Sequence, residues 1–476
     1  MRSPTYTTRE VANMAGVHRD TLLRWLRDGR VPEPARDRNS WRVFSADEAT
    51  HVVRYAEGGR DPEATTFADR RATYGYPPPY VEGVGKLSRL DWDFADAKTG
   101  YLTHSIHPYP AKFIPQIPNI LIQELSSVGE TILDPFCGSG TSLVESIRLG
   151  RHAVGVDANP LACLISLAKT TPISEADGQA LRRVADETAQ LGQQASMGTL
   201  PLFPDMPLLP PLVDGPKAKG IDDWFDQHVI EELSFAKQRC LVLTPARVRR
   251  LALTALSSII VAVSRQDSET RYVRRAKNIA PGDTLQHFSR ALTRATEAVL
   301  EFTDEVSPQL MVRLHQSDVL QRPEVGGVDL VVCSPPYPNA FSYHLYHRTR
   351  MLWLDMDQPT FKQQEIGSHR KYSRKGPSAA TADTFRSELR TVLSWLSLHL
   401  RPNRHACFVI GNSILKGKAV NNAELLTEAA TSVGFKVEAD ITRRLQDTRK
   451  YFNPAIGRIK HEHIVILRNS GGASAD

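Results

Sequence analysis

The sequence has few cysteines and no long apolar run, and each absence argues against a class of protein. Its five cysteines among 476 residues show no paired Cys-x-x-Cys spacing, which argues against a disulfide framework or a zinc site. The longest apolar run, Leu251–Val263, contains Thr and Ser and is shorter than the roughly 18 residues typical of a membrane span. No apolar stretch follows Met1–Pro4, so we expect no secretory signal and a cytoplasmic protein.

The composition is typical of a soluble chain with more than one domain. Hydrophobic residues make up 41% of the chain and charged residues 24%, which is ordinary for globular proteins. A chain of 476 residues is too long for one average domain. The net charge of +6 suits a polyanionic partner, but many basic proteins bind no nucleic acid, so the motifs have to decide.

Residues 1–60 are rich in arginine and contain no lysine. Tyr6–Val11 predicts a short capped helix, Gly16-Val17 a turn, and Arg19–Arg27 a second helix with an apolar face. A short strand at Trp41–Phe44 and a further helix are expected to follow. Two short helices joined by a glycine-containing turn form a helix-turn-helix.

The pattern Tyr-Thr-x-x-Glu-Val-Ala-x-x-Ala-Gly-Val over residues 6–17 resembles the N-terminal winged helix of MerR-type DNA-binding proteins. The resemblance covers about sixty residues and implies a domain that binds duplex DNA. It makes Arg19 and Arg24, in the second helix, candidates for DNA contacts. A small helical protein-interaction module is the alternative interpretation of this segment.

Four further segments differ in pattern. Residues 61–100 are polar and contain several prolines, which is typical of a linker. Residues 101–170 and 311–470 alternate strands with helices, whereas 171–310 has mostly helical periodicity. The pattern predicts a doubly wound α/β sheet interrupted by a mostly helical insertion that is a candidate for target recognition. We expect helices at Ala180–Gln194 and Asp283–Asp304, and strands at Thr131–Leu133, His152–Val156, Val328–Val332, Ala406–Ile410, Val437–Ile441 and His463–Leu467, the last two as an antiparallel edge pair.

The strongest motif is the glycine-rich loop after the first of these strands, Asp134-Pro135-Phe136-Cys137-Gly138-Ser139-Gly140-Thr141. Its glycines let the backbone approach a ligand where a side chain would clash. The loop lacks the third glycine of a dinucleotide-binding fingerprint and the lysine of a phosphate-binding loop, which disfavours ATP. Asp157 ends the next strand and is placed to accept hydrogen bonds from ribose hydroxyls. A turn that serves another nucleotide is the alternative.

This loop resembles the first motif, Asp-Pro-Phe-x-Gly-Ser-Gly-Thr, of the amino-methyltransferase family of DNA-modifying enzymes. The resemblance implies a Rossmann-like methyltransferase sheet, S-adenosyl-L-methionine as cofactor, and Asp157 as the ribose partner. His107–Phe113 resembles the family's segment that closes over the methionine end, and Asp318 resembles the residue that reads the adenine amino group. The expected cofactor-binding residues are His107, Lys112, Phe113, Asp134, Pro135, Phe136, Cys137, Gly138, Gly140, Thr141, Asp157 and Asp318.

A second loop, Ser334-Pro335-Pro336-Tyr337, follows the apolar strand that ends at Cys333. Two successive prolines stiffen the turn and donate no backbone hydrogen bonds, so carbonyl oxygens remain free to accept. An exocyclic amine is a poor nucleophile because its lone pair is delocalised into the ring. A hydroxyl and a prolyl carbonyl that accept its two hydrogens favour a tetrahedral nitrogen, so orientation and charge placement supply the catalysis.

We therefore assign Ser334, Pro335, Pro336 and Tyr337 as catalytic, with Tyr337 as a platform on which a flipped base stacks. Family members with Ser in the first position are mostly cytosine-N4 enzymes, and those with Asp are mostly adenine-N6 enzymes. A carbon-5 cytosine enzyme needs a nucleophilic Cys after a Pro, whereas Cys333 precedes the prolines and is interpreted as an apolar filler. A proline-rich surface loop is the alternative for this motif taken alone.

Two basic clusters are candidates for contacts with DNA. One lies in the insertion and includes Arg265, Arg271 and Arg274, although an arginine–acid network at a domain seam is equally compatible. The other follows the catalytic loop and includes Tyr343, His344 and Arg348. The histidines there lack clustered acidic partners and the reaction needs no metal, so we expect no metal site.

The sequence thus predicts a site-specific DNA methyltransferase that acts on cytosine N4 in double-stranded DNA. Adenine-N6 methylation is the first alternative. A non-catalytic DNA-binding regulator with a methyltransferase-like fold is the alternative from another class, and an RNA or protein amino-methyltransferase is a third. A restriction or defence-system partner is also compatible with the sequence, and no membrane partner is expected.

Overall fold

The computed structural model divides the chain into two compact units, Met1–Tyr80 and Val81–Asp476. Each has a hydrophobic core of its own. The residues that the structure describes are 5–15, 22, 25–26, 31–32, 34–36, 42–56, 84–94, 97–197, 216, 220–339, 341–373, 379–445 and 461–471.

The N-terminal unit pairs short strands with helices whose starts are capped. Its elements are β1 (Thr5–Thr7), α1 (Thr8–Met14), β2 (Ala35–Arg36), β3 (Arg42–Ser45) and α3 (Ala46–Ala56), and its sheet has the order β1-β3-β2. Before α1, the Thr7 and Glu10 side chains each bond to the other's backbone N–H, and Ser45 and Glu48 do the same before α3. Leu22 is fully buried in this core, whereas the predicted DNA contacts Arg19 and Arg24 lie outside the described residues.

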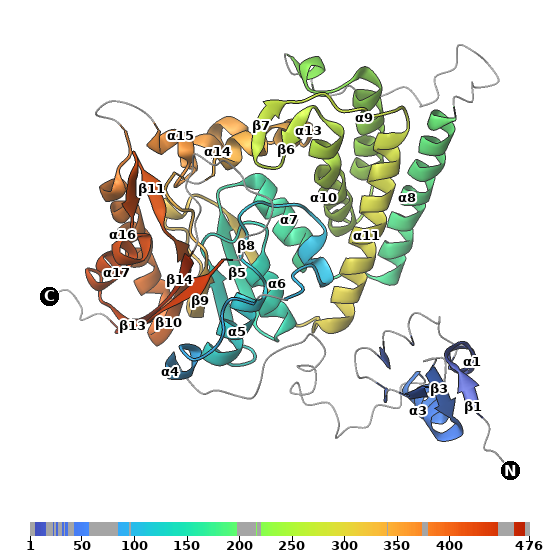
Figure 1. The fold of residues 1–476 in the computed structure, drawn as a ribbon, viewed down its shortest axis with the longest axis horizontal. Coiled ribbons are helices and arrows are strands. Elements are labelled where there is room, and N and C mark those ends of the chain that lie inside the picture. The colour runs from blue at the N-terminus through green and yellow to red at the C-terminus, as the bar shows by residue number, and fades with distance from the viewer. Residues whose placement is uncertain are drawn as a thin grey trace. The chain divides into compact units, whose positions relative to one another are not determined.

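A seven-stranded sheet forms the centre of the second unit (Figure 1). Its order is β13-β14-β10-β9-β4-β5-β8, with β14 antiparallel to both neighbours and the other contiguous pairs parallel. This confirms the predicted doubly wound sheet and its antiparallel edge pair. The strands are β4 (Thr131–Asp134), β5 (His152–Asp157), β8 (Val312–Gln316), β9 (Val328–Cys333), β10 (Leu400–Gly411), β13 (Phe435–Arg444) and β14 (His461–Asn469).

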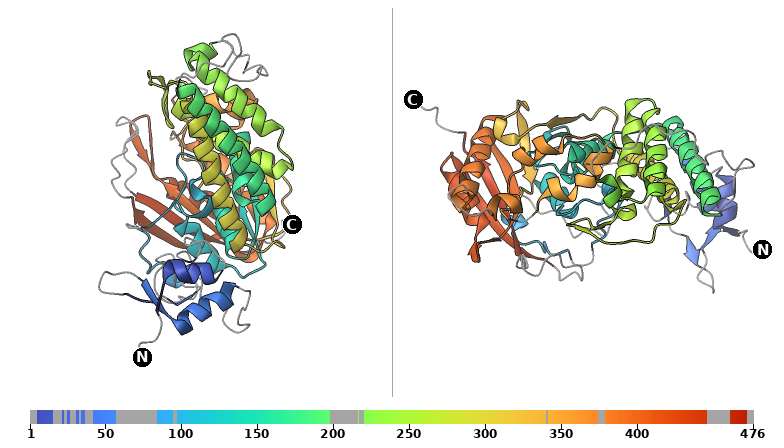
Figure 2. Two further views of the ribbon diagram at one scale, coloured as in Figure 1. Left: turned by 90° about the vertical axis from the view of Figure 1, so that its right-hand side faces the viewer. Right: turned by 90° about the horizontal axis from the view of Figure 1, so that it is seen from above.

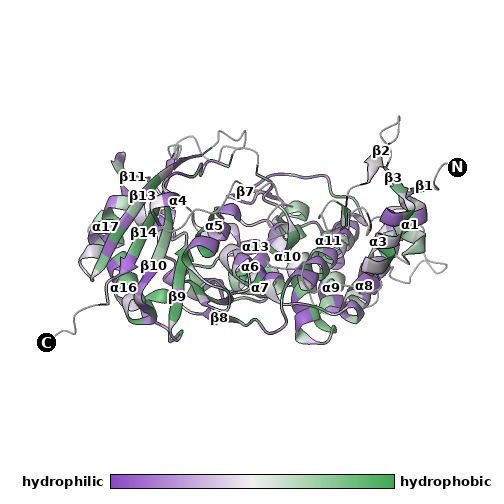
Figure 3. Cartoon of the chain, turned by 90° about the horizontal axis from the view of Figure 1, so that it is seen from below, coloured by the Kyte–Doolittle hydropathy of each residue, from purple (hydrophilic) through white to green (hydrophobic). Residues whose placement is uncertain are grey.

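Helices cover both faces of the sheet, which explains why its central strands are buried and mostly apolar. All six residues of β9 are buried, and Figure 3 shows the hydrophobic colouring along this strand. On β5, Val154 and Val156 belong to the same hydrophobic cluster as residues of the helices Ala382–His399 and Asn422–Thr431. Ala153 belongs to a cluster with residues of the helix Thr141–Arg148. The flanking helices are α5 (Gln116–Leu125), α6 (Thr141–Arg148), α7 (Pro160–Thr170), α16 (Ala382–His399) and α17 (Asn422–Thr431).

The segment between α7 and β8 forms the predicted helical insertion, whose long helices lie side by side (Figure 2). Its helices are α8 (Glu175–Ser196), α9 (Gln227–Leu241), α10 (Ala246–Val263) and α11 (Asp283–Glu305). The apolar run noted in the sequence forms α10, which is buried within this bundle. Among the described residues, no helix is long and apolar enough to cross a membrane.

Two parts of this unit differ from the sequence prediction. The insertion also contains a hairpin of β6 (Gln266–Ser268) and β7 (Arg271–Arg274), which we had not predicted. The predicted linker 61–100 is too long, because Val84–Leu87 forms α4 and Trp92 is 2% exposed. Trp92 accepts a hydrogen bond through its carbonyl oxygen from Arg443 Nε on β13, so this part of the chain packs on the sheet.

Four short helices join β9 to α16, and a small hairpin follows β10. We call residues 341–373, which contain these helices, the catalytic arm. The helices are α12 (Tyr343–Tyr346), α13 (Arg348–Trp353), α14 (Gln358–Gln364) and α15 (His369–Tyr372), and the hairpin strands are β11 (Ser413–Leu415) and β12 (Lys418–Val420).

Candidate active site

The two motif loops leave the sheet at neighbouring points on the same edge. β4 and β9 are adjacent and parallel, with Leu133 opposite Val331. From β4 the chain proceeds outward through β5 and β8 on one side, and then crosses to β9 on the other. At such a reversal the flanking connections diverge and leave a crevice at the carboxyl ends of the strands. The cofactor loop, residues 134–141 with its glycines, and the catalytic loop, residues 334–337, therefore both border this crevice.

Asp134 stabilises the glycine loop from inside. Its Oδ1 accepts a hydrogen bond from Phe136 N at 3.0 Å, and its Oδ2 accepts one from Ser142 Oγ at 2.6 Å. The residue is 1% exposed, and this burial raises the pKa of its carboxyl to about 7. Both oxygens are engaged within the loop, so Asp134 shapes the predicted pocket instead of offering a free carboxylate to a ligand.

Gly140 lets the loop pack directly on α7. Its φ of +79° is a left-handed conformation that favours glycine. A Cβ at this position would lie 3.0 Å from Ser166 Cβ and 3.1 Å from Ser166 Cα. Ser166 Oγ in turn donates to the carbonyl oxygen of Gly138 at 2.7 Å. The loop is thus fixed on one side by α7, and its Gly138 backbone has a positive φ of +50°.

Asp157, at the end of β5, faces the same loop. Its Oδ2 accepts a hydrogen bond from Gly138 N at 2.8 Å, and its Oδ1 accepts one from Asn159 N at 2.8 Å. Burial, together with the nearby Glu365 carboxylate, raises the pKa of Asp157 to about 6. The carboxylate is therefore beside the glycine loop, as a ribose partner must be, and it already orders the loop.

Replacing Asp157 with alanine should weaken S-adenosylmethionine binding by about tenfold or more, because a charged acceptor and a support of Gly138 are lost together. In the wild-type protein, affinity should fall as the pH drops through about 6, since a protonated carboxyl accepts fewer hydrogen bonds. Calorimetric titrations on both sides of that pH measure both effects. Asp440→Ala is a matched control, because Asp440 pairs with His463 on the edge strands. Unchanged affinity in Asp157→Ala would place the ribose partner elsewhere.

The segment His107–Phe113 reaches the loop through Tyr109, a residue that the sequence interpretation did not select. The Tyr109 ring lies 3.5 Å from the position that a Cβ on Gly138 would occupy. Its hydroxyl accepts a hydrogen bond from Asn159 Nδ2 at 3.3 Å. The sequence signal for Tyr109 is its aromatic ring within His107–Phe113, the segment predicted to cover the cofactor.

The two polar residues predicted in that segment are engaged elsewhere. His107 is 1% exposed, and its Nε2 lies 3.0 Å from Ser257 Oγ on α10. Lys112 Nζ donates to the carbonyl oxygen of His104 at 2.6 Å. Both side chains stabilise the segment in this structure, so their predicted contact with the cofactor stays a prediction, as does that of Phe113.

Asp318 lies just beyond β8 instead of closing it, since the strand ends at Gln316. Its side chain caps the short 3-10 helix Val319–Gln321, with Oδ1 accepting from Leu320 N at 2.9 Å. Because β8 is parallel to β5, Asp318 is at the same sheet edge as Asp157. Its proposed contact with an adenine amino group stays a prediction.

The catalytic loop is anchored through its tyrosine. Tyr337 Oη lies 3.1 Å from Glu462 Oε1 on β14 and 3.3 Å from the carbonyl oxygen of Val409 on β10, and its single proton is donated to one of these acceptors at a time. Ser334 Oγ lies 3.4 Å from the same Oη and is partly exposed. The backbone of the loop is also held by Gly367, where a Cβ would lie 2.7 Å from the Tyr337 carbonyl oxygen. The predicted stacking residue is thus fixed at its hydroxyl end.

The two motif loops meet at a narrow gap that has no room for a water molecule. Phe136 from the cofactor loop lines it together with Pro335 and Pro336 from the catalytic loop, and α16 closes it. Cys333 is 0% exposed, and its burial raises the pKa of the thiol well above the usual value. A protonated buried thiol agrees with its interpretation as a filler.

The catalytic arm folds back over the cofactor loop through an aromatic cluster. The Tyr343 ring stacks on Tyr109 with centroids 5.7 Å apart, and the His347 ring lies 5.0 Å from Tyr109. His344 was predicted to contact DNA, but it is 2% exposed and its Nδ1 lies 2.5 Å from Glu365 Oε2. The burial corrects that prediction, because His344 stabilises the arm. Tyr343 is partly buried at the cofactor loop.

The three predicted arginines of the insertion all pair with acids of the chain. Arg265 binds Asp226, Arg271 lies 3.3 Å from Asp267, and Arg274 lies 3.3 Å from Asp223. The alternative of an arginine–acid network therefore describes these contacts. The side chains of Arg271 and Arg274 are nevertheless 65% and 57% exposed. Arg348 is exposed beside them, with its Cζ 5.8 Å from the Tyr272 ring centroid.

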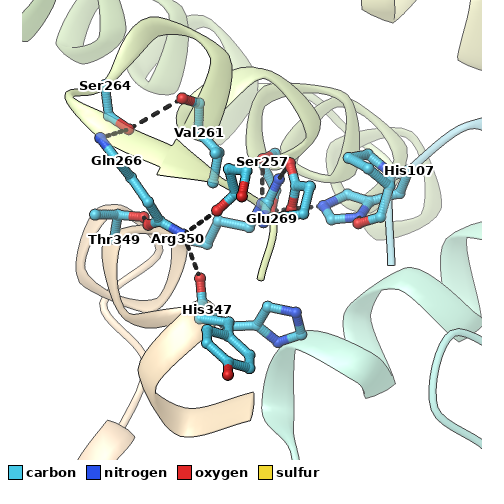
Figure 4. A network of polar contacts seen from close by, with 12 residues as sticks. His107, Ser257, Val261, Ser264, Gln266, Glu269, His347, Thr349 and Arg350 are labelled. Carbon is cyan, nitrogen blue, oxygen red and sulfur yellow. Dashed lines mark hydrogen bonds and ion pairs between the residues drawn. The ribbon is translucent and has the colours of Figure 1, made fainter. Parts of the chain in front are cut away.

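An ion pair between a buried arginine and a partly exposed glutamate connects the insertion, the catalytic arm and the segment before the cofactor loop (Figure 4). Arg350 is 0% exposed and binds both oxygens of Glu269 with Nη1 and Nη2, at 2.6 Å and 2.7 Å. Its Nε donates to the Ser257 carbonyl oxygen at 2.8 Å, and the Ser257 hydroxyl contacts His107. Bidentate pairs of this kind fix geometry strongly, so the insertion supports both sides of the crevice.

Comparisons with known proteins agree with both motif resemblances. Residues 68–168 match a family described as DNA methylase, and this stretch includes the cofactor loop and Asp157. Residues 6–54 match a family described as MerR HTH family regulatory protein. Over residues 68–168 the chain is thus similar to the DNA methylase family.

Curated relatives of this chain are type II methyltransferases. M.MvaI of Kocuria varians is 28% identical over 281 residues, which are 55% of this chain and 60% of that protein. M.MjaII of Methanocaldococcus jannaschii is 38% identical over 101 residues, 20% of this chain and 18% of that protein. M2.DpnII of Streptococcus pneumoniae is 40% identical over 67 residues, 13% of this chain and 25% of that protein. The chain thus matches less than two thirds of the length of each.

The family match supports S-adenosylmethionine as the cofactor, and the residues at the crevice fit it. Gly138 and Gly140 leave backbone accessible beside the Asp157 carboxylate, which suits a nucleoside with free ribose hydroxyls. Among the described residues, no three side chains of His, Cys, Asp or Glu are grouped so that they could hold a metal ion.

Proposed function

We propose that the protein is a site-specific DNA methyltransferase that transfers a methyl group from S-adenosylmethionine to the exocyclic N4 amino group of cytosine in duplex DNA. The supporting observation is that the cofactor loop and the catalytic loop follow adjacent parallel strands and line one narrow gap. Adenine N6 is the alternative acceptor, since the same geometry suits either amino group.

The catalytic loop acts by orienting the amine. Ser334 Oγ and the Pro335 carbonyl oxygen accept the two amino hydrogens, which directs the nitrogen lone pair toward the crevice. The bound cofactor supplies an electrophilic methyl group on a sulfonium. Tyr337 is fixed by its hydroxyl, so its ring is a preorganised surface for a base that has left the duplex.

Serine at position 334 favours cytosine over adenine as the target base. Sequencing with modified-base detection, on DNA from cells that express the protein, reports the base and the recognition sequence together. We expect N4-methylcytosine at a fixed motif, and none in cells that express Ser334→Ala. N6-methyladenine at a fixed motif would overturn the base assignment but not the reaction class.

Duplex DNA is the proposed partner for two reasons. The N-terminal match to MerR-type proteins indicates a DNA-binding domain, and the exposed Arg271, Arg274 and Arg348 surround the stacked pair Trp224 and Tyr272. Phosphate contacts of this kind make affinity fall steeply with salt. The same N-terminal match favours a second candidate, a DNA-binding regulator without catalysis, and a regulator of this kind should show no affinity for S-adenosylmethionine in a titration.

A further inference from the structure

Glu462 connects the catalytic loop to the edge strands of the sheet. It lies near the start of β14, where it pairs with Gly411 of β10 and Arg443 of β13. Its Oε1 accepts from Tyr337 Oη at 3.1 Å, and its Oε2 accepts from Arg443 Nη1 at 3.0 Å. Ser334 Oγ lies 3.4 Å from Tyr337 Oη. A series of two oxygen–oxygen contacts therefore leads from Ser334 through Tyr337 to the Glu462 carboxylate.

The proposed reaction requires a group that accepts a proton, which such a series of contacts can supply. When a neutral amine takes a methyl group from a sulfonium, its nitrogen gains a positive charge and must release a proton. The Pro335 carbonyl can accept a hydrogen bond but cannot pass a proton on. A hydroxyl can accept one proton and release its own, provided that it faces a second acceptor. Ser334 has this second acceptor in Tyr337.

We propose that Glu462 is the terminal proton acceptor of a relay that leads from the target amine through Ser334 Oγ and Tyr337 Oη. The inference rests on the proposed function. An N–H bond of the methylated amine breaks as an O–H bond forms on Ser334, and the Ser334 proton moves to Tyr337. The Tyr337 proton moves to Glu462, whose carboxylate becomes a carboxyl group. The nitrogen keeps its new bond to carbon, and no oxidant or reductant is needed.

The surroundings of Glu462 suit a proton acceptor. Burial raises the pKa of its carboxyl, while Arg443 lowers it and keeps the carboxylate form accessible. Arg443 is 5% exposed and is itself fixed by the Trp92 carbonyl oxygen. Among the described residues, the charged and titratable groups that face Glu462 are Arg443 from β13 and Tyr337 from the catalytic loop, and β10 contributes backbone.

Tyr337 suits the middle position for the complementary reason. Burial and the nearby Glu462 raise the pKa of its phenol well above the usual value, so the hydroxyl stays protonated. A neutral phenol that both accepts and donates passes a proton without holding it. Glu462 acts through Tyr337 and Ser334 and touches no substrate atom, so its contribution has to appear in the pH dependence of the rate.

Single-turnover methyl transfer, measured against pH at saturating cofactor, tests the relay. The variants are Glu462→Gln, which keeps the size and one acceptor, and Tyr337→Phe, which keeps the ring. The wild-type rate should fall as the pH drops through the pKa of Glu462, because a protonated carboxyl cannot accept. Both variants should be about 100-fold slower, lose this acidic fall, and bind S-adenosylmethionine normally. Glu462→Asp should restore part of the rate together with the acidic fall.

Glu438→Gln is the matched control. Glu438 is also a half-buried acid of the same sheet, bound to Arg468 and His405, and has no contact with the catalytic loop. It should keep the wild-type rate and pH profile. A Glu462→Gln protein within twofold of the wild-type rate, with the acidic fall retained, overturns the relay alone. If Glu462→Gln does not fold, Tyr337→Phe decides by the same criteria. A wild-type protein that methylates no DNA overturns the proposed function and the relay together.

Discussion

Replacing Ser334 with alanine should lower the methyl-transfer rate by about 10²–10³-fold while S-adenosylmethionine still binds. The side chain follows a fully buried strand but is itself partly exposed, and within the described part of the chain its hydroxyl has one polar contact, the 3.4 Å approach to Tyr337 Oη. Its loss therefore removes an acceptor for the target amine without leaving a cavity in the core. Single-turnover assays measure the rate, and calorimetry measures cofactor affinity.

Ser397→Ala controls for the loss of a serine hydroxyl in general. The Ser397 hydroxyl donates to the Ser394 carbonyl oxygen of its own helix, near the C-terminal end of α16. It should leave rate and affinity unchanged. A Ser334→Ala protein with the full wild-type rate would contradict the assigned role of this residue, and equal losses of rate and cofactor affinity would make Ser334 a cofactor contact instead.

Replacing Gly140 with alanine should weaken cofactor affinity by at least about tenfold and destabilise the fold by about 1–3 kcal/mol. The new Cβ would lie too close to the Cα and Cβ of Ser166, and these atoms cannot rotate away. Either α7 or the loop must move, and loop movement displaces Gly138 from Asp157. Calorimetric binding and thermal unfolding measure the two effects.

Gly434→Ala separates the backbone effect from the clash. Gly434 also has a positive φ, +89°, but a Cβ there would meet nothing within 4 Å. The free energy of unfolding of Gly434→Ala should fall by about 1 kcal/mol because of the strained backbone, and its cofactor affinity should stay normal. Equal losses of affinity in the two variants would show that contact with Ser166 does not shape the cofactor loop.

The sequence was sufficient to predict the elements that carry the site. The strand at Thr131–Leu133 and the one at Val328–Val332 were apolar enough to be predicted as buried, and each is followed by its motif loop. Proline pairs and closely spaced glycines define local backbone geometry, so the loops 134–141 and 334–337 could be found without a structure. The antiparallel edge pair was also predicted correctly.

The supporting contacts could not be predicted, because their partners are far apart in the sequence. Tyr337 meets Glu462 across 125 residues, and Arg350 meets Glu269 across 81. No local pattern indicates such pairs. The prediction of His344 as a DNA contact was wrong because a polar side chain was taken to be exposed. In the structure Glu365 is its buried partner.

The most direct measurement is transfer of a labelled methyl group from S-adenosylmethionine to unmethylated duplex DNA by the purified protein, with the product nucleoside identified by mass spectrometry. If the adjacent loops act together on an exocyclic amine, the label should appear in N4-methylcytosine, or in N6-methyladenine if adenine is the target, and should be absent with Ser334→Ala. Label in 5-methylcytosine, or no labelled nucleoside in any DNA that contains the recognition sequence, would contradict this account.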